Sequence, residues 1–174
     1  MEQLPYKTGD RVPLIVAFAR EEGFCDGNYQ ILSDKRPGRN NNPLDLEWNA
    51  ETHSFGATSG DPRFAVFPDL KTGWNAGRRW LSVKARYETV PFSLEYPKGR
   101  RLAHGYLGAT IQEVVFRFAP TNENNSMSYL RNICAFSEIT PDTILTTELL
   151  NEGPFDPTSE QSAPKSTGPS VQES

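Results

Sequence analysis

The chain has 174 residues, of which 36% are hydrophobic, 23% charged and 11% aromatic. This length fits one domain, and the composition excludes a collagen, a coiled coil and a fully disordered chain. The net charge of −4 argues against a role in coating nucleic acid, for which a basic surface is expected.

The predicted elements begin with a helix over 12–24, whose strong helix formers end at Gly23, a typical C-terminal stop. A long polar loop follows over 25–42. Apolar and polar residues then alternate over 44–48 and again over 63–67, which is the pattern of half-buried strands. We expect these two strands to pair as a small hairpin sheet.

The rest of the body has a helical periodicity. Four further helices are predicted, over 68–86, over 107–118, over 127–137 and from 141 onward. Asn124 or Asn125 can cap the third of these, and the stretch 88–106 interrupts the helical pattern with two prolines and Gly99. The predicted fold is α+β and mainly helical, with a small β-wing after the first helix.

The last 24 residues differ from the body in composition. The segment 151–174 contains four prolines and only three apolar residues. Because so few apolar groups cannot offset the entropy of ordering the chain, the sequence predicts a domain over 1–150 and a disordered tail over 151–174.

The chain has few residues that could form a metal site or a disulfide bond. The two cysteines and two histidines match no zinc spacing, so we expect neither a metal nor another cofactor. Without a visible secretory signal, the thiols of Cys25 and Cys134 are expected to stay free. No apolar run reaches the roughly 18 residues of a membrane span.

Glu22 is the candidate catalytic residue. On a helical wheel it lies about 20° from the centre of the apolar face, whereas Glu21 lies about 120° away. Burial and the partly negative end of the helix both raise the pKa of such a carboxyl group. A carboxylic acid that stays protonated near neutral pH is what a glycosidase needs to protonate a leaving oxygen. The alternative is a buried Glu22 that forms an ion pair for structural reasons.

Candidate substrate-binding residues fall into two groups. The amides of Asn40, Asn41 and Asn42 precede Pro43; they either shape a turn or are held to bind sugar hydroxyls. The aromatic side chains that could stack on sugar faces, with core packing as the alternative, are those of Tyr29, Trp48 and Tyr106.

Four motifs together resemble a group of small phage and bacterial proteins. In chain order they are AFAREEGF (17–24), RNNNP (39–43), RFAVF (63–67) and RFAPTNEN (117–124), the last followed by Tyr129. That family is lysozyme-like, is related to lytic transglycosylases and glucosaminidases, and includes many virion proteins.

The resemblance covers about residues 14–145 and implies a lysozyme-like domain that faces peptidoglycan. Glu22 matches the catalytic acid of the family, and the Asn box (Asn40–Asn42) would line the sugar groove. Leu44 departs from the family pattern, in which glycine follows Asn-Pro, so we expect a turn that favours positive φ to be rebuilt there. Relative to the family, the stretch 88–106 looks like an insertion.

Two functions are therefore expected. The first is cleavage of the peptidoglycan glycan strand, either by a lytic transglycosylase that needs Glu22 alone or by a muramidase with a second carboxylate. Asp45, Glu47 and Asp61 are the candidates for that second group. The alternative function is that of a non-catalytic virion or assembly protein that keeps the scaffold and binds other virion proteins. Made in the cytoplasm, the chain would be carried in a virion or released to the cell wall by another route.

Overall fold

The computed structural model describes residues 2–83, 89–90, 100–101, 106–119 and 125–158. These residues combine helices with two small antiparallel sheets, each of two strands. The helices are α1 (Leu14–Glu21), α2 (Arg36–Arg39), α3 (Ala50–Ser54), α4 (Leu70–Val83), α5 (Ile111–Phe118), α6 (Ser126–Ser137) and α7 (Thr147–Asn151). The strands are β1 (Ser59–Asp61), β2 (Phe64–Val66), β3 (Thr89–Val90) and β4 (Arg100–Arg101). The predicted mixture of α and β is confirmed.

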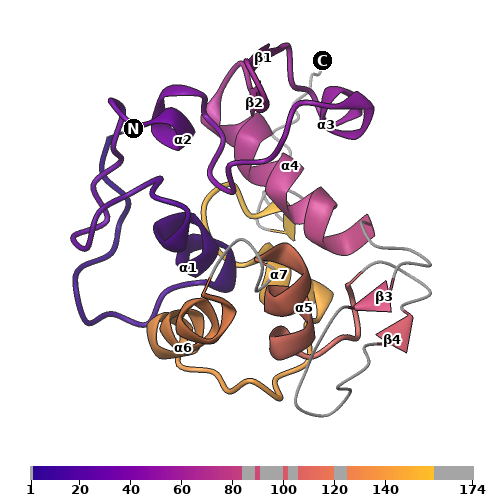
Figure 1. Ribbon diagram of the computed structural model, residues 1–174. Helices are drawn as coiled ribbons and strands as arrows, with labels where there is room; N and C mark the ends of the chain where they lie inside the picture. Colours follow the sequence, from indigo (N-terminus) through magenta and orange to yellow (C-terminus); the bar gives the residue numbers. More distant parts are fainter. Residues whose placement is uncertain (1, 84–88, 91–99, 102–105, 120–124, 159–174) are drawn as a thin grey trace, which may run out of the picture.

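The arrangement places two groups of elements opposite each other. Figure 1 shows α1, α5 and α6 together on one side, and α2, α3 and the β1–β2 hairpin on the other, with α4 between them on one flank. Helix α1 contacts α4, α6 and α7, and α5 contacts α6. The segment from the start of α2 to the end of β2, residues 36–66, is called the wing below.

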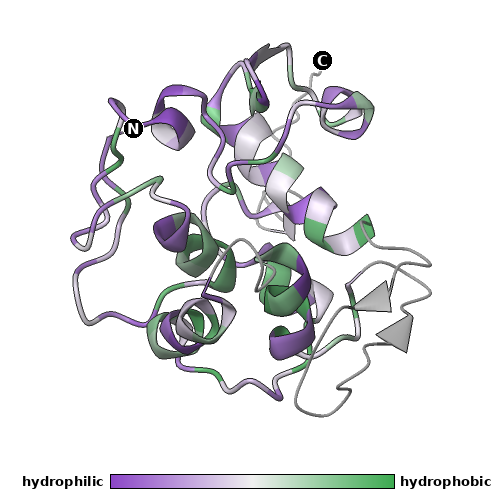
Figure 2. Cartoon of the chain, in the orientation of Figure 1, coloured by the Kyte–Doolittle hydropathy of each residue, from purple (hydrophilic) through white to green (hydrophobic). Residues whose placement is uncertain are grey.

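Helix α1 is the centre of the core. All of its residues from Leu14 to Ala19 have no exposed surface, so this helix is covered on every side rather than along one stripe. Figure 2 shows apolar segments concentrated on α1, α5 and α6, where these helices meet. The position of Glu21 and Glu22 at the end of such a helix brings carboxyl groups to the edge of the core.

The predicted helices 12–24, 68–86, 107–118 and 127–137 are confirmed as α1, α4, α5 and α6, with shifted ends. Local caps explain some of these ends. The side chain of Thr110 accepts a hydrogen bond from the Glu113 N–H at 3.2 Å and forms a capping box at the start of α5. Asn125, one of the two predicted caps, accepts from the Ser128 N–H at 3.0 Å and starts α6.

The predicted hairpin is wrong in one of its strands. Strand β2 pairs with β1, in the register Ser59↔Val66 to Asp61↔Phe64, and not with a strand over 44–48. Residues 44–48 run along the other edge of β2 with one isolated bridge, Glu47↔Phe64. Asp45 has a φ of 51°, which breaks the extended path that a strand requires.

Two predictions about helices are also corrected. The segment 25–42 is not all loop, because it contains α2, and α3 follows it with a capping box of Asn49 and Thr52. No helix opens at 141: the backbone N–H of Leu145 donates to the Ala109 carbonyl at 2.8 Å, and α7 begins only after Thr146.

The boundary predicted at residue 150 also lies too early. The buried Arg78 donates to the carbonyl oxygens of Glu152 at 3.2 Å and Pro154 at 2.7 Å, and Phe155 packs against the core. The body therefore extends to at least residue 156. The rest of the predicted tail, 159–174, lies outside the described residues, as does most of the stretch 88–106, of which β3 and β4 pair with each other.

Within the ranges that the structure describes, no helix has both the length and the apolar character of a membrane span. Both cysteines are free thiols, Cys25 buried and Cys134 partly buried.

Candidate functional site

The end of α1 fixes the position of Glu22. The Glu22 N–H still donates to the Phe18 carbonyl at 3.0 Å, in the pattern of the helix. Gly23 follows with a φ of 80°, a left-handed conformation that favours glycine, and the Phe24 N–H returns to the Ala19 carbonyl at 3.0 Å. Glu22 is thus held in the last turn of a helix whose residues from Leu14 to Ala19 are fully buried.

The Glu22 carboxyl group is bound by a tyrosine from α6. The Tyr129 hydroxyl donates to Glu22 Oε2 at 2.7 Å, and only 7% of Tyr129 is exposed. Its ring lies beside those of Phe18 and Phe118, with centroids 5.9 and 6.2 Å away. The hydrogen bond therefore lies at an apolar boundary and fixes one of the two carboxyl oxygens.

Burial raises the pKa of Glu22 to about 7. Desolvation of the charged form is the largest cause, and the charges of Asp45 and Glu21 act in the same direction. The hydrogen bond from Tyr129 and the charge of Arg36 oppose them. Among the described residues Glu22 forms no ion pair, so none of them makes it the anion of a structural ion pair.

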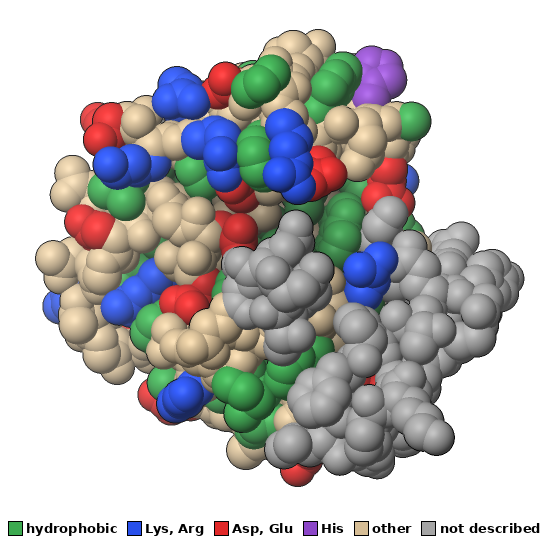
Figure 3. All heavy atoms as spheres, viewed as in Figure 1, with side chains coloured by type: hydrophobic (Ala, Val, Ile, Leu, Met, Phe, Trp, Pro, Cys, Tyr) green, Lys and Arg blue, Asp and Glu red, His purple; other side chains and the backbone are tan. Residues whose placement is uncertain are grey.

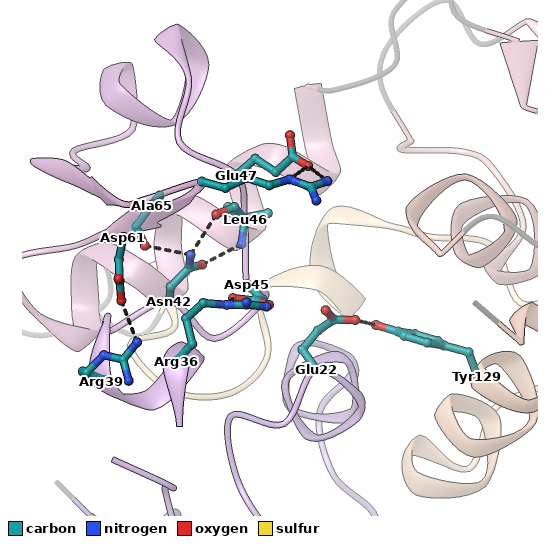
Figure 4. A network of polar contacts seen from close by, with 11 residues as sticks. Glu22, Arg36, Arg39, Asn42, Asp45, Leu46, Glu47, Asp61, Ala65 and Tyr129 are labelled. Atoms are coloured by element: carbon teal, nitrogen blue, oxygen red, sulfur yellow. Dashed lines mark hydrogen bonds and ion pairs between the residues drawn. The ribbon is translucent and has the colours of Figure 1, made fainter. Parts of the chain in front are cut away.

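An ion pair of the wing faces Glu22. Arg36 Nε donates to Asp45 Oδ1 at 3.0 Å, and Arg36 Nη2 contacts Asp45 Oδ2. The Arg36 guanidinium stacks on Phe64, with 3.5 Å between Cζ and the ring centroid. Figure 4 shows this ion pair directed from the wing toward the Glu22 carboxyl group. The Asp45 side chain is only 8% exposed.

Two further acids of the wing are also paired with arginines. Asp61 accepts from Arg39 at 2.7 Å, which lowers the pKa of Asp61, and Glu47 accepts from Arg63 Nε at 2.9 Å. Both carboxylates are more exposed than Asp45. Figure 3 shows the face of the molecule seen in Figure 1. Acidic side chains lie in the middle of this face, below a group of basic side chains.

The Asn box serves the fold rather than a sugar groove. Asn42 is fully buried, and its Nδ2 donates to the carbonyls of Leu46 and Ala65, both at 2.9 Å. Asn41 donates to the Phe67 carbonyl at 3.1 Å, and Asn40 is only 3% exposed. The amides of Asn41 and Asn42 tie the segment after α2 to β2 and to the residue that follows it, so the prediction that Asn40, Asn41 and Asn42 line a sugar groove is not supported.

Two of the three aromatic candidates lie in the core. Tyr29 is 1% exposed and its hydroxyl accepts a hydrogen bond from Arg20 at 2.9 Å, while Tyr106 is fully buried against Trp80. Neither ring presents a face to a sugar. Trp48 is 37% exposed, beside His53 on the wing, and alone of the three can stack on a ligand.

Glu21, which the helical wheel places away from the apolar face, is partly buried. Its carboxylate accepts from Asn132 at 3.1 Å, and partial burial raises its pKa. The turn after Pro43 places its positive φ on Asp45, and Leu44 is buried against Gly77 of α4. The positive φ thus lies one residue after the position where the family pattern has glycine.

Sequence reasoning gave no role to two residues that shape this site. In the sequence, Tyr129 only follows the last motif, and Arg36 lies in the predicted loop 25–42. Tyr129 meets Glu22, and Arg36 meets Asp45, only in the folded chain. No cluster of ligands for a metal ion occurs among the residues described here.

No protein-family model matches the sequence, and no curated protein matches it either.

Proposed function

We propose that this chain cleaves the glycan strand of peptidoglycan, with Glu22 as the general acid. One observation carries this function: a carboxyl group with a pKa of about 7 at the end of a buried helix, opposite the Arg36–Asp45 pair. A general acid works best when its pKa is near the working pH. We propose peptidoglycan rather than another glycan, and a lysozyme-like fold, because the four motifs resemble those of the lysozyme-like family.

The geometry suits proton transfer to a leaving oxygen. Tyr129 donates to Oε2, and no described residue donates to Oε1, so Oε1 is the oxygen on which the neutral acid can carry its proton. Glu22 would pass this proton to the glycosidic oxygen while the bond from that oxygen to the anomeric carbon breaks. The resulting carboxylate can then accept a proton from the muramyl 6-hydroxyl group, which gives an anhydro sugar, or from water, which gives hydrolysis.

A non-catalytic virion protein with the same scaffold is the second candidate. The observation in its favour is the burial of Asn42, Tyr29 and Tyr106, which leaves fewer sugar-binding side chains than the family motifs suggest. Under either function we propose that the chain reaches the cell wall within a virion or by a separate release route.

Clearing of purified cell walls separates the two functions. We expect the wild-type protein to lower the turbidity and Glu22→Gln to be slower by a factor on the order of 10² or more, the scale for loss of a general acid. Glu21→Gln is the matched control, because Glu21 is the neighbouring half-buried carboxyl group but binds Asn132 instead of facing the wing. It should keep most of the activity. Absence of clearing by all three proteins would support the virion role.

A further inference from the structure

We propose that Asp45 is a second catalytic carboxylate, so that this site hydrolyses the glycosidic bond instead of forming an anhydro sugar. This role rests on the glycan cleavage proposed above and goes beyond it, since Glu22 alone would suffice for transglycosylation. Three acids of the wing could supply such a group, and the structure distinguishes among them.

Position favours Asp45 over Glu47 and Asp61. Figure 4 shows the Asp45 carboxylate directed toward Glu22, with Asp61 beyond it on the far side and Glu47 paired with its arginine off to another side. The electrostatic interactions agree with this position. The charge of Asp45 raises the pKa of Glu22, and neither Glu47 nor Asp61 is among the groups that shift it. Asp45 is also the least exposed, at 8% compared with 52% for Glu47 and 38% for Asp61.

The contacts of Asp45 hold its carboxylate in place. Arg36 donates to both oxygens through Nε and Nη2, in the two-point geometry of an arginine–carboxylate pair. Arg36 is in turn fixed on the Phe64 ring and in α2. The backbone of Asp45 adopts a φ of 51°, uncommon for a residue with a side chain. A strained backbone and a doubly bound carboxylate are more than a solvated surface acid requires.

The two acids therefore suit different roles. Glu22, whose burial raises its pKa to about 7, can act as the acid, and Asp45, the ion-pair partner of Arg36, can stabilise positive charge, which is the division of roles in glycoside hydrolysis. Glu22 gives its proton to the leaving oxygen, and the bond between that oxygen and the anomeric carbon breaks. Asp45 stabilises the positive charge that develops there while the oxygen of a water molecule bonds to the anomeric carbon. One proton of that water stays on the new hydroxyl group and the other passes to Glu22, so both acids regain their starting states.

The products of peptidoglycan digestion test this role without any variant. Hydrolysis leaves a reducing end on the released muropeptide, whereas transglycosylation leaves a 1,6-anhydro end, and the two differ by one water in mass. We expect reducing ends. Anhydro ends from the wild-type protein would overturn the role of Asp45 and leave the function of Glu22 standing, whereas an inactive wild-type protein would contradict both.

Substitutions then test the residue itself. Asp45→Asn keeps the size and tolerates the left-handed backbone, and we expect its rate to fall by a factor on the order of 10² or more at every pH. Glu47→Gln and Asp61→Asn are matched controls that also leave an arginine without its partner, and they should stay within a few-fold of the wild type. If Asp45→Asn stays as active as these controls and only shifts its pH profile, Asp45 is merely a neighbouring charge and the role is refuted.

A small carboxylate provides a readout that misfolding cannot imitate. Asp45→Gly suits the positive φ and leaves a space where the side chain was. We expect added formate to restore part of the lost activity to this variant and none to Glu22→Gln. Failure of formate to raise the rate of a folded Asp45→Gly protein, as judged by its thermal unfolding, would count against a catalytic Asp45.

Discussion

At the scale of single residues, Glu22 links the chemistry of the site to the stability of the fold. Its pKa is about 7 in the folded protein, against an ordinary value of 4.5. The folded state therefore binds the proton more tightly than the unfolded state. Below pH 4.5 both states are protonated and Glu22 has no effect; as the pH rises from 4.5 to 7 the free energy of unfolding falls, and above 7 the full cost of about 3 kcal/mol is present.

Glu22→Gln should remove this cost, because glutamine keeps the shape of a neutral acid and does not ionise. We expect the variant to gain stability relative to the wild type as the pH rises from 4.5 to 7.5, by an amount on the order of 1–3 kcal/mol. Urea unfolding at several pH values measures the difference, with the exposed Glu138→Gln as the control. A difference between Glu22→Gln and wild type that does not change with pH would show that Glu22 is an ordinary carboxylate.

At the scale of elements, periodicity and caps were sufficient for the four longer helices but not for the short helices α2, α3 and α7. The apolar positions of α1, α4, α5 and α6 recur at helical spacing, and the Asn125 cap precedes α6 by one residue. The hairpin could not be predicted, because β1 is the polar sequence Ser-Gly-Asp, which has no alternation of apolar residues. The pairing of β1 with β2 is set instead by the turn at 62–63 and by tertiary packing.

The same distinction applies to the candidate site. Glu22 was predictable because its place on a helical wheel depends on the sequence of α1 alone. The role of Asn42 was not, since its partner Ala65 lies 23 residues away. An asparagine that donates to the backbone carbonyl of a distant strand has the same local sequence as one that binds a ligand. Only the tertiary structure distinguishes the two.

The contact between α4 and the Asn box gives a prediction for an element. A Cβ atom at Gly73 would lie 2.9 Å from the carbonyl carbon of Asn41 and closer still to its oxygen. Alanine in place of glycine within a helix normally adds up to about 1 kcal/mol of stability. Because backbone atoms cannot move aside easily, we expect Gly73→Ala to destabilise the protein by about 1–3 kcal/mol instead.

Gly77, one turn later in α4, is the matched control for Gly73. A Cβ atom there would meet side chains and no backbone, that of Leu44 at 2.9 Å and that of Ile15 at 3.6 Å, and the Leu44 side chain can shift. Urea unfolding of Gly73→Ala and Gly77→Ala should therefore show the larger loss at Gly73. A stabilised Gly73→Ala protein would mean that the box and α4 do not approach as closely as the structure shows.

At the scale of the whole molecule, the segment 151–156 fastens two helices of the core. Arg78 of α4 is 4% exposed and its guanidinium donates to the carbonyls of Leu150, Glu152 and Pro154. Gly153 lies against Pro13 at the start of α1, where its φ of 109° and the nearby proline ring leave no room for a side chain. The segment thus joins α4 to the helix that carries Glu22.

Shortening the chain tests this fastening. A protein of residues 1–150 loses the Glu152 and Pro154 carbonyls and the packing of Phe155, while its new terminal carboxylate keeps a contact with Arg78. Since each lost hydrogen bond to a buried charge costs roughly 1.5–3 kcal/mol, we expect a loss of about 3 kcal/mol. For a domain of this size that lowers the Tm by roughly 6–12 °C. A protein of residues 1–158 retains every described contact of the segment and is the control. Equal melting temperatures for the two shortened proteins would show that the contacts of Arg78 contribute nothing to the fold, and that the body does end at residue 150.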